Sequence, residues 1–521
     1  MTMDIAICLA LAITTFAGLG LVALLAGDRH ARLTGMALEA GALACLALGV
    51  AAIVRIVQVG PVTTDLLVWQ TAGLSVRLDA VSLPIMVLVA FIGWIVLRFA
   101  RTYMAEEPRR AFFQAWLAFT LASVLLFALS GNLVQLVLAW VATSLCLHRL
   151  LLFYPHRAAA RRAARKKFLT ARVADGALIG AAVLLATLYR TGDIGSILDA
   201  ARSGEGDARV TLAVFGLAIA AALKSAQFPL HGWLTEVMEA PTPVSALLHA
   251  GVINAGGFLL IRFADVLLLS PSVMAGLVMV GGFTAVFGGL VMLTQPAVKT
   301  SLAWSTVAQM GFMIMQCGLA LFPLAMLHII AHSLYKAHSF LASGGAVERI
   351  AALRRPGPVA IPGTAAVTSA FIAAIAIYVA MGWAFDFQEK SPQSNALGAI
   401  LIFGVAYLLA QGLAGAAPVA LMRRMVAYSL VASLGYFMLH ILADRLMLGT
   451  LPAAPAPGPL EWVLIVLAVV SFGLVAFAQS MFPLWAYHPA AAGLRVHLSN
   501  GLYANALFDR LLSGWALRRT L

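Results

Sequence analysis

Long apolar stretches, separated by short polar connections, follow one another along nearly the whole chain. Each stretch is close to the roughly 20 residues that a helix needs to cross the hydrocarbon core of a bilayer. The pattern predicts a polytopic, all-α membrane protein of about 13–15 transmembrane helices. The expected spans are residues 5–26, 34–57, 80–100, 111–130, 132–154, 168–189, 208–235, 242–264, 272–294, 299–320, 322–346, 358–385, 396–420, 424–448 and 459–487.

Composition agrees with this pattern and excludes several classes of chemistry. Of the 521 residues, 62% are hydrophobic and only 11% are charged, which is far more apolar than a soluble domain. The sequence has no GxxxxGK[ST] phosphate loop, no dinucleotide fingerprint after a strand and no CxxC pair, so we expect neither ATP hydrolysis nor redox chemistry in this chain. The cysteines are Cys8, Cys45, Cys146 and Cys317. All four lie in apolar stretches without metal spacing, so we expect no disulfide, metal or cofactor here.

Positive charge gathers in alternate connections, although the net charge of +13 would suggest nucleic acid in a soluble protein. The basic connections hold Arg29, Arg32, Arg101, Arg109, Arg110, Arg157, Arg161, Arg162, Arg165, Lys166, Lys167, Arg349, Arg354, Arg355, Arg423 and Arg424. The connections between them hold Asp193, Asp199, Glu205, Asp207, Asp386 and Glu389. Because basic loops stay in the cytoplasm, we expect a protein of the bacterial inner membrane with its N-terminus outside and its C-terminus inside. Docking of an acidic partner or anionic lipid is an alternative use of block 157–167.

Lys224 is the most informative polar residue in a span, because it follows the apolar run from Val210 to Leu223. An ammonium group at that depth is costly unless it meets water or a counter-charge, or loses its proton. Pro229 cannot donate to the carbonyl of Ser225, so the helix is expected to open within a turn of the lysine. Transporters build midplane ion sites from such broken helices, which favours ion passage over a structural role for Lys224.

His328, His332 and Lys336 recur every four residues and therefore stack on one face of a predicted helix. Desolvation disfavours the charged forms of both residue types, which makes this face a candidate proton relay. His338 points in another direction, and relay and structural roles are both open for it.

Other polar residues inside spans are weaker candidates. Arg172 and Asp175 are spaced to pair along a helix, where structure and function explain them equally well. His249 is a better relay candidate than Asn254, whose amide suffices to join two helices. Lys299 begins a span, so it either contributes to an ion path or snorkels to the interface.

Apolar residues also recur at helical spacing near the C-terminus, namely Tyr503, Leu507, Phe508, Leu511, Leu512 and Trp515. They predict a short amphipathic helix within residues 500–521, at the cytoplasmic surface. Lying on lipid and docking a soluble partner are both open for this tail. The candidate partner face comprises Glu236, Glu239, Tyr503, Phe508 and Trp515.

Four runs, residues 224–230, 240–250, 302–306 and 332–344, resemble the antiporter-like subunits of respiratory complex I, such as subunit L of NADH-quinone oxidoreductase, and of Mrp-type cation antiporters. The resemblance implies two inverted five-helix repeats with broken helices and a proton path at the midplane. The family's conducting positions fall on Lys224, His249, Lys299, His328, His332 and Lys336, and its polar pair falls on Arg172 and Asp175.

The same resemblance implies four segments. These are N-terminal helices at 1–110, a first repeat at 111–265 broken near Pro229, a second repeat at 266–420, and C-terminal helices with the tail at 421–521. The sequence departs from the family where Val141 replaces the glutamate expected after Trp140. No intramembrane lysine follows Lys336, since Lys390 lies in a predicted loop. The chain also ends without the long lateral helix of the complex I subunit, which argues against an orthodox place in that complex.

Residues 231–240, 249–259 and 496–503 are more similar to the DabB family, the membrane subunits of DAB inorganic-carbon pumps. That resemblance implies a non-enzymatic subunit that binds a soluble, zinc-containing, carbonic-anhydrase-like DabA partner. Cation flow would then make hydration of CO2 to bicarbonate one-way. The alternatives are a proton-pumping subunit of a respiratory or hydrogenase complex and an Mrp-type Na+/H+ antiporter subunit. Lysines and histidines suit H+ but do not exclude Na+.

Overall fold

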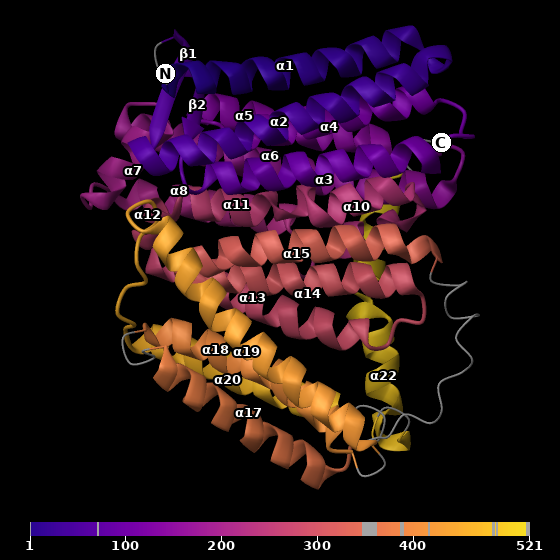
Figure 1. Cartoon of the computed structure of the whole chain (residues 1–521), viewed down its shortest axis with the longest axis vertical. Helices are drawn as coiled ribbons and strands as arrows, with labels where there is room; N and C mark the ends of the chain where they lie inside the picture. The colour runs from indigo at the N-terminus through magenta and orange to yellow at the C-terminus, as the bar shows by residue number, and fades with distance from the viewer. Residues whose placement is uncertain are drawn as a thin grey trace. The chain divides into compact units, whose positions relative to one another are not determined.

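The computed structural model describes the chain except for residues 1, 70–71, 346–361, 386–389, 415–416, 482–484, 486–487 and 517–521. Almost all described elements are helices (Figure 1). The chain divides into two compact units. Unit 1 comprises Met1–Met274, His328–Gly344 and Gly449–Pro452, and unit 2 comprises Ala275–Leu327, Gly345–Leu448 and Ala453–Leu521. Arg349, Arg354, Arg355, Asp386 and Glu389, which supported the predicted orientation, lie outside the described residues.

Twelve helical segments of the described chain are long and apolar enough to cross a membrane. Three more helices occupy predicted spans. Helix α8 is shorter, with 17 residues, whereas α14 and α15 have 21 each and carry polar side chains along their length. The predicted multi-pass helical fold is therefore confirmed.

Unit 1 begins with six long helices that pack side by side, because their apolar faces meet one another. They are α1 (Thr2–Ala26), α2 (Ala31–Val59), α3 (Ser82–Tyr103), α4 (Arg110–Ala128), α5 (Leu133–Leu151) and α6 (Ala158–Tyr189). Shorter helices follow: α7 (Ile194–Arg202), α8 (Ala208–Lys224), α9 (Gly232–Glu236), α10 (Thr242–Ala250), α11 (Ala255–Arg262) and α12 (Ala264–Leu268). The four-segment division expected from the sequence stays a prediction.

A β-hairpin at one end of unit 1 departs from the all-α expectation (Figure 1). Strand β1 (Val62–Trp69) pairs antiparallel with β2 (Ala72–Leu78), and the register shifts between Asp65 and Leu67. Residues 62–78 are too short to span and are rich in threonine and valine, which favour strands. The pattern of apolar stretches predicted no element between residues 57 and 80, so the hairpin is a finding of the structure.

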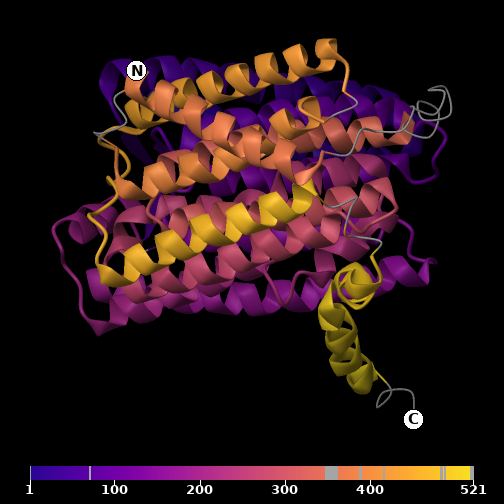
Figure 2. The ribbon, with the colours of Figure 1, turned by 90° about the horizontal axis from the view of Figure 1, so that it is seen from below.

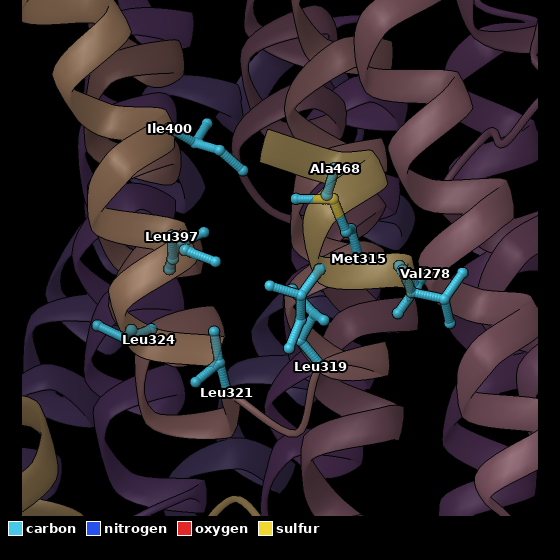
Figure 3. Packing of buried hydrophobic residues seen from close by; sticks show 11 residues of the cluster. Val278, Met315, Leu319, Leu321, Leu324, Leu397, Ile400 and Ala468 are labelled. Atoms are coloured by element: carbon cyan, nitrogen blue, oxygen red, sulfur yellow. The ribbon is translucent and has the colours of Figure 1, made fainter. Parts of the chain in front are cut away.

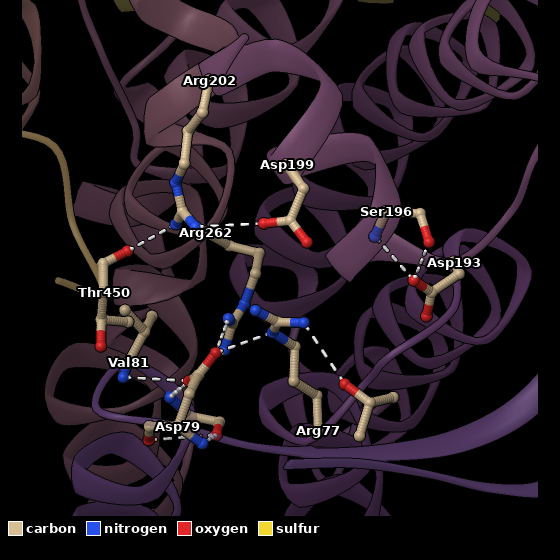
Figure 4. Close-up of polar contacts among 11 residues, drawn as sticks. Arg77, Asp79, Val81, Asp193, Ser196, Asp199, Arg202, Arg262 and Thr450 are labelled. Carbon is tan, nitrogen blue, oxygen red and sulfur yellow. Dashed lines mark hydrogen bonds and ion pairs between the residues drawn. The ribbon is translucent and has the colours of Figure 1, made fainter. Parts of the chain in front are cut away.

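An ion cluster fixes this hairpin to the helices (Figure 4). Asp79 accepts from the backbone N–H groups of Val81 and Ser82 at the start of α3, at 3.0 and 2.8 Å. Both terminal nitrogens of Arg262 bind its carboxylate, at 2.6 and 3.1 Å, and Arg77 binds it at 2.8 Å. Burial opposes ionisation of Asp79, but the arginines and the donated hydrogen bonds outweigh it and hold its pKa below the usual range. The hairpin, α3 and α11 are thus joined through one buried carboxylate.

Unit 2 contains most of the later helices, and α13 and α15 pass between the units along the chain. The elements are α13 (Pro271–Met292), α14 (Val298–Gly318), α15 (Phe322–Ala342), α17 (Thr364–Ala384), α18 (Pro392–Gly412), α19 (Val419–Met447), α20 (Pro459–Ser480), α22 (Ala492–Ser499) and α23 (Ala504–Ala516). Its core is apolar, with Met315 of α14, Leu397 of α18 and Ala468 of α20 in one buried cluster (Figure 3). Helix α23 confirms the helix predicted in the tail, which turns away from α20 (Figure 2).

Candidate ion-transfer site

Lys224 ends α8 at the first of two helix breaks in unit 1. Helical structure resumes only at Gly232, the first residue of α9, so the break predicted from Pro229 is confirmed. Between them, Ala226 has a positive φ of 50°, a conformation that cannot continue the helix. The lysine is 7% exposed. Its ammonium group is therefore held among helix ends instead of in the middle of a regular helix.

The second break interrupts the next span between α10 and α11, which the sequence analysis expected to be continuous. Gly251 leaves the helical region at φ −121° and ψ −75°. Ser225, beside Lys224, donates its hydroxyl to the carbonyl of Ile253 in the second break, at 3.1 Å. A side chain at Gly256 would collide with the Ala221 carbonyl and the Ser225 hydroxyl, so glycine allows this close approach. The two breaks therefore meet, and a hydroxyl of the first satisfies a backbone carbonyl of the second.

The indole ring of Trp140 contacts both Lys224 and an acidic residue of the site. The Lys224 ammonium lies 4.3 Å from the ring centroid of Trp140 on α5. The Trp140 Nε1–H donates to Asp175 Oδ1 of α6 at 3.0 Å. Asp175 in turn forms the predicted pair with Arg172, at 2.6 Å. Within the described ranges, Lys224 itself makes no ion pair. The lysine thus faces a cation–π partner whose N–H is bound to a carboxylate.

Lys167 of α6 adds a second buried cation to the same region. Its ammonium donates to the carbonyl and hydroxyl of Ser144 on α5, at 2.6 and 2.9 Å. Arg172 donates to the same hydroxyl at 3.2 Å. The sequence analysis placed Lys166 and Lys167 in a basic connection, which is wrong, because α6 already begins at Ala158 and buries both side chains. Both lysines follow several arginines in the sequence, and no sequence signal distinguished them from residues of a basic loop.

The first break is tied to the basic end of α6 by acidic residues. Glu236 binds Lys166 at 2.6 Å and lies 3.7 Å from Arg162. Glu239 pairs with Arg157 at 3.1 Å, and its side chain is 42% exposed. Of the two acids expected on a partner face, Glu239 is therefore the more accessible.

The predicted face of α15 is present in unit 1. The rings of His328 and His332 lie 6.0 Å apart, and His332 and Lys336 are buried. His338 is exposed, as its different direction predicts. His249 of α10 stacks on Phe340 of α15, with the ring centroids 4.3 Å apart. These contacts bring His249 to the same helix as the histidine and lysine face.

A small cavity lies beside the second break. Asn254 donates to the Ala250 carbonyl and to the hydroxyl of Ser333, the residue after His332, at 3.0 and 2.8 Å. Its own carbonyl oxygen is buried and has no partner within the described ranges. The cavity of about 30 Å³ is lined by Asn254, Ser333 and mostly apolar side chains such as Phe127 and Phe258. That volume holds one or two waters, and Asn254 and Ser333 offer polar atoms to bind them.

The remaining predicted residues lie outside this cluster. Lys299 is half-buried in the first turn of α14, in unit 2. Tyr503 is exposed and Phe508 is half-buried in the tail, whereas the side chain of Trp515 lies outside the described residues. Among the residues that the structure describes, no group of three histidine, cysteine or acidic side chains is placed to hold a metal ion.

Two protein families match the chain. The family described as NADH:quinone oxidoreductase/Mrp antiporter, TM, matches residues 130–355, and the N-terminal family of complex I chain 5 matches residues 70–114. Two solved structures share the fold. The Mrp complex from Dietzia sp. has a TM-score of 0.66 at 23% identity, covering 98% of this chain and 60% of that chain. Respiratory complex I from Thermus thermophilus has a TM-score of 0.55 at 17% identity, covering 95% and 99%.

Curated relatives are more similar in sequence. The probable inorganic carbon transporter subunit DabB2 of Halothiobacillus neapolitanus is 35% identical over 449 residues, which cover 84% of this chain and 80% of the relative. The probable inorganic carbon transporter subunit DabB of Hydrogenovibrio crunogenus is 43% identical over 283 residues, covering 53% and 54%. The chain therefore belongs to the DabB family of inorganic carbon transporter subunits, within the antiporter-like proteins of complex I and Mrp complexes.

Proposed function

We propose that this protein is the membrane subunit of a two-subunit inorganic-carbon pump, and that it conducts protons whose flow energises the other subunit. The observation that carries the proposal is Lys224 at the meeting point of two broken helices, buried and facing Trp140 instead of a carboxylate. Such a lysine exchanges its proton without breaking a salt bridge of its own. The names of the relatives as inorganic carbon transporter subunits support the substrate class.

Asp175 serves in this proposal as the counter-charge that Val141 does not supply. The carboxylate is linked to the lysine through the Trp140 indole, whose N–H donates to it at 3.0 Å. When Lys224 is protonated, the ring face stabilises the ammonium, and the carboxylate polarises the ring from its edge. When Lys224 loses its proton, Asp175 keeps both Trp140 and Arg172 as partners. Both protonation states are thereby accommodated without rearranging the helices.

The proton then passes to the α15 face formed by His328, His332 and Lys336, with His249 contributing. Contacts that support this step are the Ser225–Ile253 and Asn254–Ser333 hydrogen bonds, which connect the break at Lys224 with the break beside α15. The water-sized cavity at Asn254 and Ser333 lies along this connection. Lysine and histidine exchange protons, so we assign H+ to the path.

The proposed partner is a large, soluble, zinc-containing subunit of DabA type, with carbonic-anhydrase-like character. In this proposal it hydrates CO2 to bicarbonate, and zinc belongs to it and not to this chain. We place the basic connections and the tail on the cytoplasmic side of the inner membrane, and the N-terminus outside, because of the charge distribution. Glu239 and Tyr503, both accessible, are offered to the partner on that side.

The test is Lys224→Ala in the native complex, purified through the partner and reconstituted in lipid vesicles. We expect proton flux to be abolished while the partner and its zinc are retained, because the apolar run before Lys224 still spans. His338→Ala, which removes an exposed side chain, is the matched control and should conduct normally.

Wild-type flux in the Lys224→Ala vesicles would refute the proposed path. The subunit composition of the purified wild-type complex distinguishes the proposed carbon pump from the two alternative kinds of membrane complex. Flavin and iron–sulfur subunits would identify a respiratory or hydrogenase pump, and several small membrane subunits would identify an Mrp-type antiporter. A single large zinc protein is the outcome that we expect.

A further inference from the structure

We propose that Lys390, His440 and Asp444 form a second proton-transfer site, located within unit 2. The inference rests on the proposed function, since it assumes that the protein conducts protons. It concerns the part of the chain after Lys336, where the sequence offers no lysine within a predicted span. Lys390 is the only lysine that follows Lys336 in the sequence, and it was read as a loop residue.

The three side chains make a continuous chain of contacts. Lys390, two residues before α18, places its Nζ 3.3 Å from Nδ1 of His440 on α19. The other ring nitrogen of His440, Nε2, lies 3.3 Å from Oδ2 of Asp444, one turn further along α19. A neutral imidazole has one N–H donor and one bare acceptor nitrogen. His440 therefore accepts from the ammonium on one side while it donates to the carboxylate on the other.

The site runs from a buried group to an exposed one. His440 is 2% exposed, whereas the Asp444 side chain is 52% exposed. The Lys390 ammonium is half-buried and lies 5.0 Å from the ring centroid of Phe437. Burial lowers the pKa of Lys390 below its usual value, and the Asp444 charge opposes this shift. A lysine in this setting releases its proton more readily than one in water.

The surroundings favour transfer over a fixed salt bridge. His440 lies between the lysine and the acid, so the two opposite charges do not touch. The edge of Tyr436 packs on the His440 ring with centroids 5.6 Å apart. The Tyr436 hydroxyl is buried without a hydrogen-bond partner in the described ranges. Two titratable groups interact electrostatically with Tyr436, namely Tyr378 of α17 and Asp444. These neutral groups exclude water around the imidazole without adding charge.

The position of the site along α19 separates it from the basic connections. Arg423 and Arg424 lie in the first turns of α19, and His440 lies 16 residues beyond Arg424. At 1.5 Å per residue, that is about 24 Å along the helix axis. The site is therefore close to the opposite end of this span, where protons enter or leave the membrane.

The proposed step balances without any other reactant. The N–H bond of the Lys390 ammonium breaks as a new N–H bond forms at His440 Nδ1. The Nε2–H bond of His440 breaks as an O–H bond forms on Asp444. The ammonium becomes an amine, the carboxylate becomes an acid, and the imidazole stays neutral with its tautomer exchanged. Release of the Asp444 proton to water then completes the passage, and the reverse sequence serves inward flow.

Lys390→Arg is the decisive variant in the reconstituted native complex. Arginine keeps the positive charge and the contact with Phe437 but does not release a proton. We expect a loss of proton flux of roughly tenfold or more, since a positioned acid or base contributes at least that much. Full flux with arginine would overturn the inference, because a structural cation would then suffice.

His440→Ala and Asp444→Asn are expected to lower the flux as well, with Arg445→Ala as the matched control. Arg445 is exposed beside Asp444, so its loss removes a surface charge without touching the relay. Retained partner and an unchanged melting temperature of the complex would show that the variants fold. If wild-type vesicles conduct and Lys224→Ala vesicles do not, yet all three relay variants conduct normally, only this inference fails. If wild-type vesicles do not conduct, the proposed function fails instead.

Discussion

Unit 1 holds two buried clusters of charged side chains, which differ in whether the opposite charges are in direct contact. At the hairpin end, Asp79 meets Arg262 and Arg77 directly, with distances of 2.6 to 3.1 Å (Figure 4). At the helix breaks, Lys224 meets the ring of Trp140, and the carboxylate of Asp175 accepts the indole N–H of the same residue. The first arrangement fixes both charges, because either one alone would be stranded in a dry environment. The second gives the lysine an aromatic partner in place of an ion pair, which is the arrangement that our proposal uses for proton exchange. The cluster that fixes the fold is thus a different one from the cluster to which we assign proton transfer, although both lie in the same unit.

The largest effect that would distinguish the two clusters is expected from Asp79→Ala, which should lower the stability of the fold. Removing the carboxylate strands Arg262, which is 2% exposed, and costs about 3–5 kcal/mol of folding free energy. The melting temperature of the purified complex, or its yield from the membrane, measures the loss. Asp65→Ala is the control, because Asp65 is exposed on the same hairpin. An unchanged melting temperature for Asp79→Ala would mean that the cluster does not fix the fold.

The same cluster has a defined pH dependence. Because the pKa of Asp79 is lower in the folded protein than in the unfolded chain, its stabilising contribution is fully present above pH of about 4 and is lost as the pH falls. The wild-type complex should therefore lose stability in acid more steeply than the Asp79→Ala variant does. Parallel losses in both proteins would contradict this assignment.

A second, strong effect is expected on the transfer side, at the α15 face. His332→Ala and Lys336→Ala should each lower proton flux roughly tenfold or more, because both buried side chains face the proposed path. His338→Ala should change the flux by less than about twofold, since its side chain is exposed on another side of the helix. Equal losses from all three variants would undo the argument from the helix face.

The fold and the separate members of the site were predictable from sequence, but their connections were not. The length of the apolar stretches predicted the spans, and Pro229 predicted the first helix break. The separation of three residues between Arg172 and Asp175 predicted their ion pair. The second break at Gly251 was missed, because a glycine in an apolar run does not show which backbone conformation it adopts.

Contacts between residues that are far apart in the sequence could not be predicted either. Trp140 and Asp175 lie on different helices, and only packing brings the indole N–H to the carboxylate. Lys167 was hidden in a basic block, since burial of one lysine among many depends on where the helix begins and what it packs against. Lys390 lies in the connection before α18, as predicted, but its contact with His440 could not be predicted, because the two residues are 50 positions apart in the sequence.

The smallest and sharpest effect is expected from Trp140→Phe. Phenylalanine keeps an aromatic face beneath the Lys224 ammonium but removes the N–H that binds Asp175. A hydrogen bond to a charged group is worth about 1.5–3 kcal/mol, and only part of it bears on Lys224, so the flux should fall roughly fivefold. Asp175→Ala, which removes the acceptor of the same hydrogen bond, should produce at least as large a loss, and the double variant should be little worse than Asp175→Ala alone, because both changes remove the same link. Proton flux into vesicles measures all three. Fully additive losses would show that the tryptophan and the carboxylate act on Lys224 independently, and the indole would then be a packing residue and not the connection between the two charges.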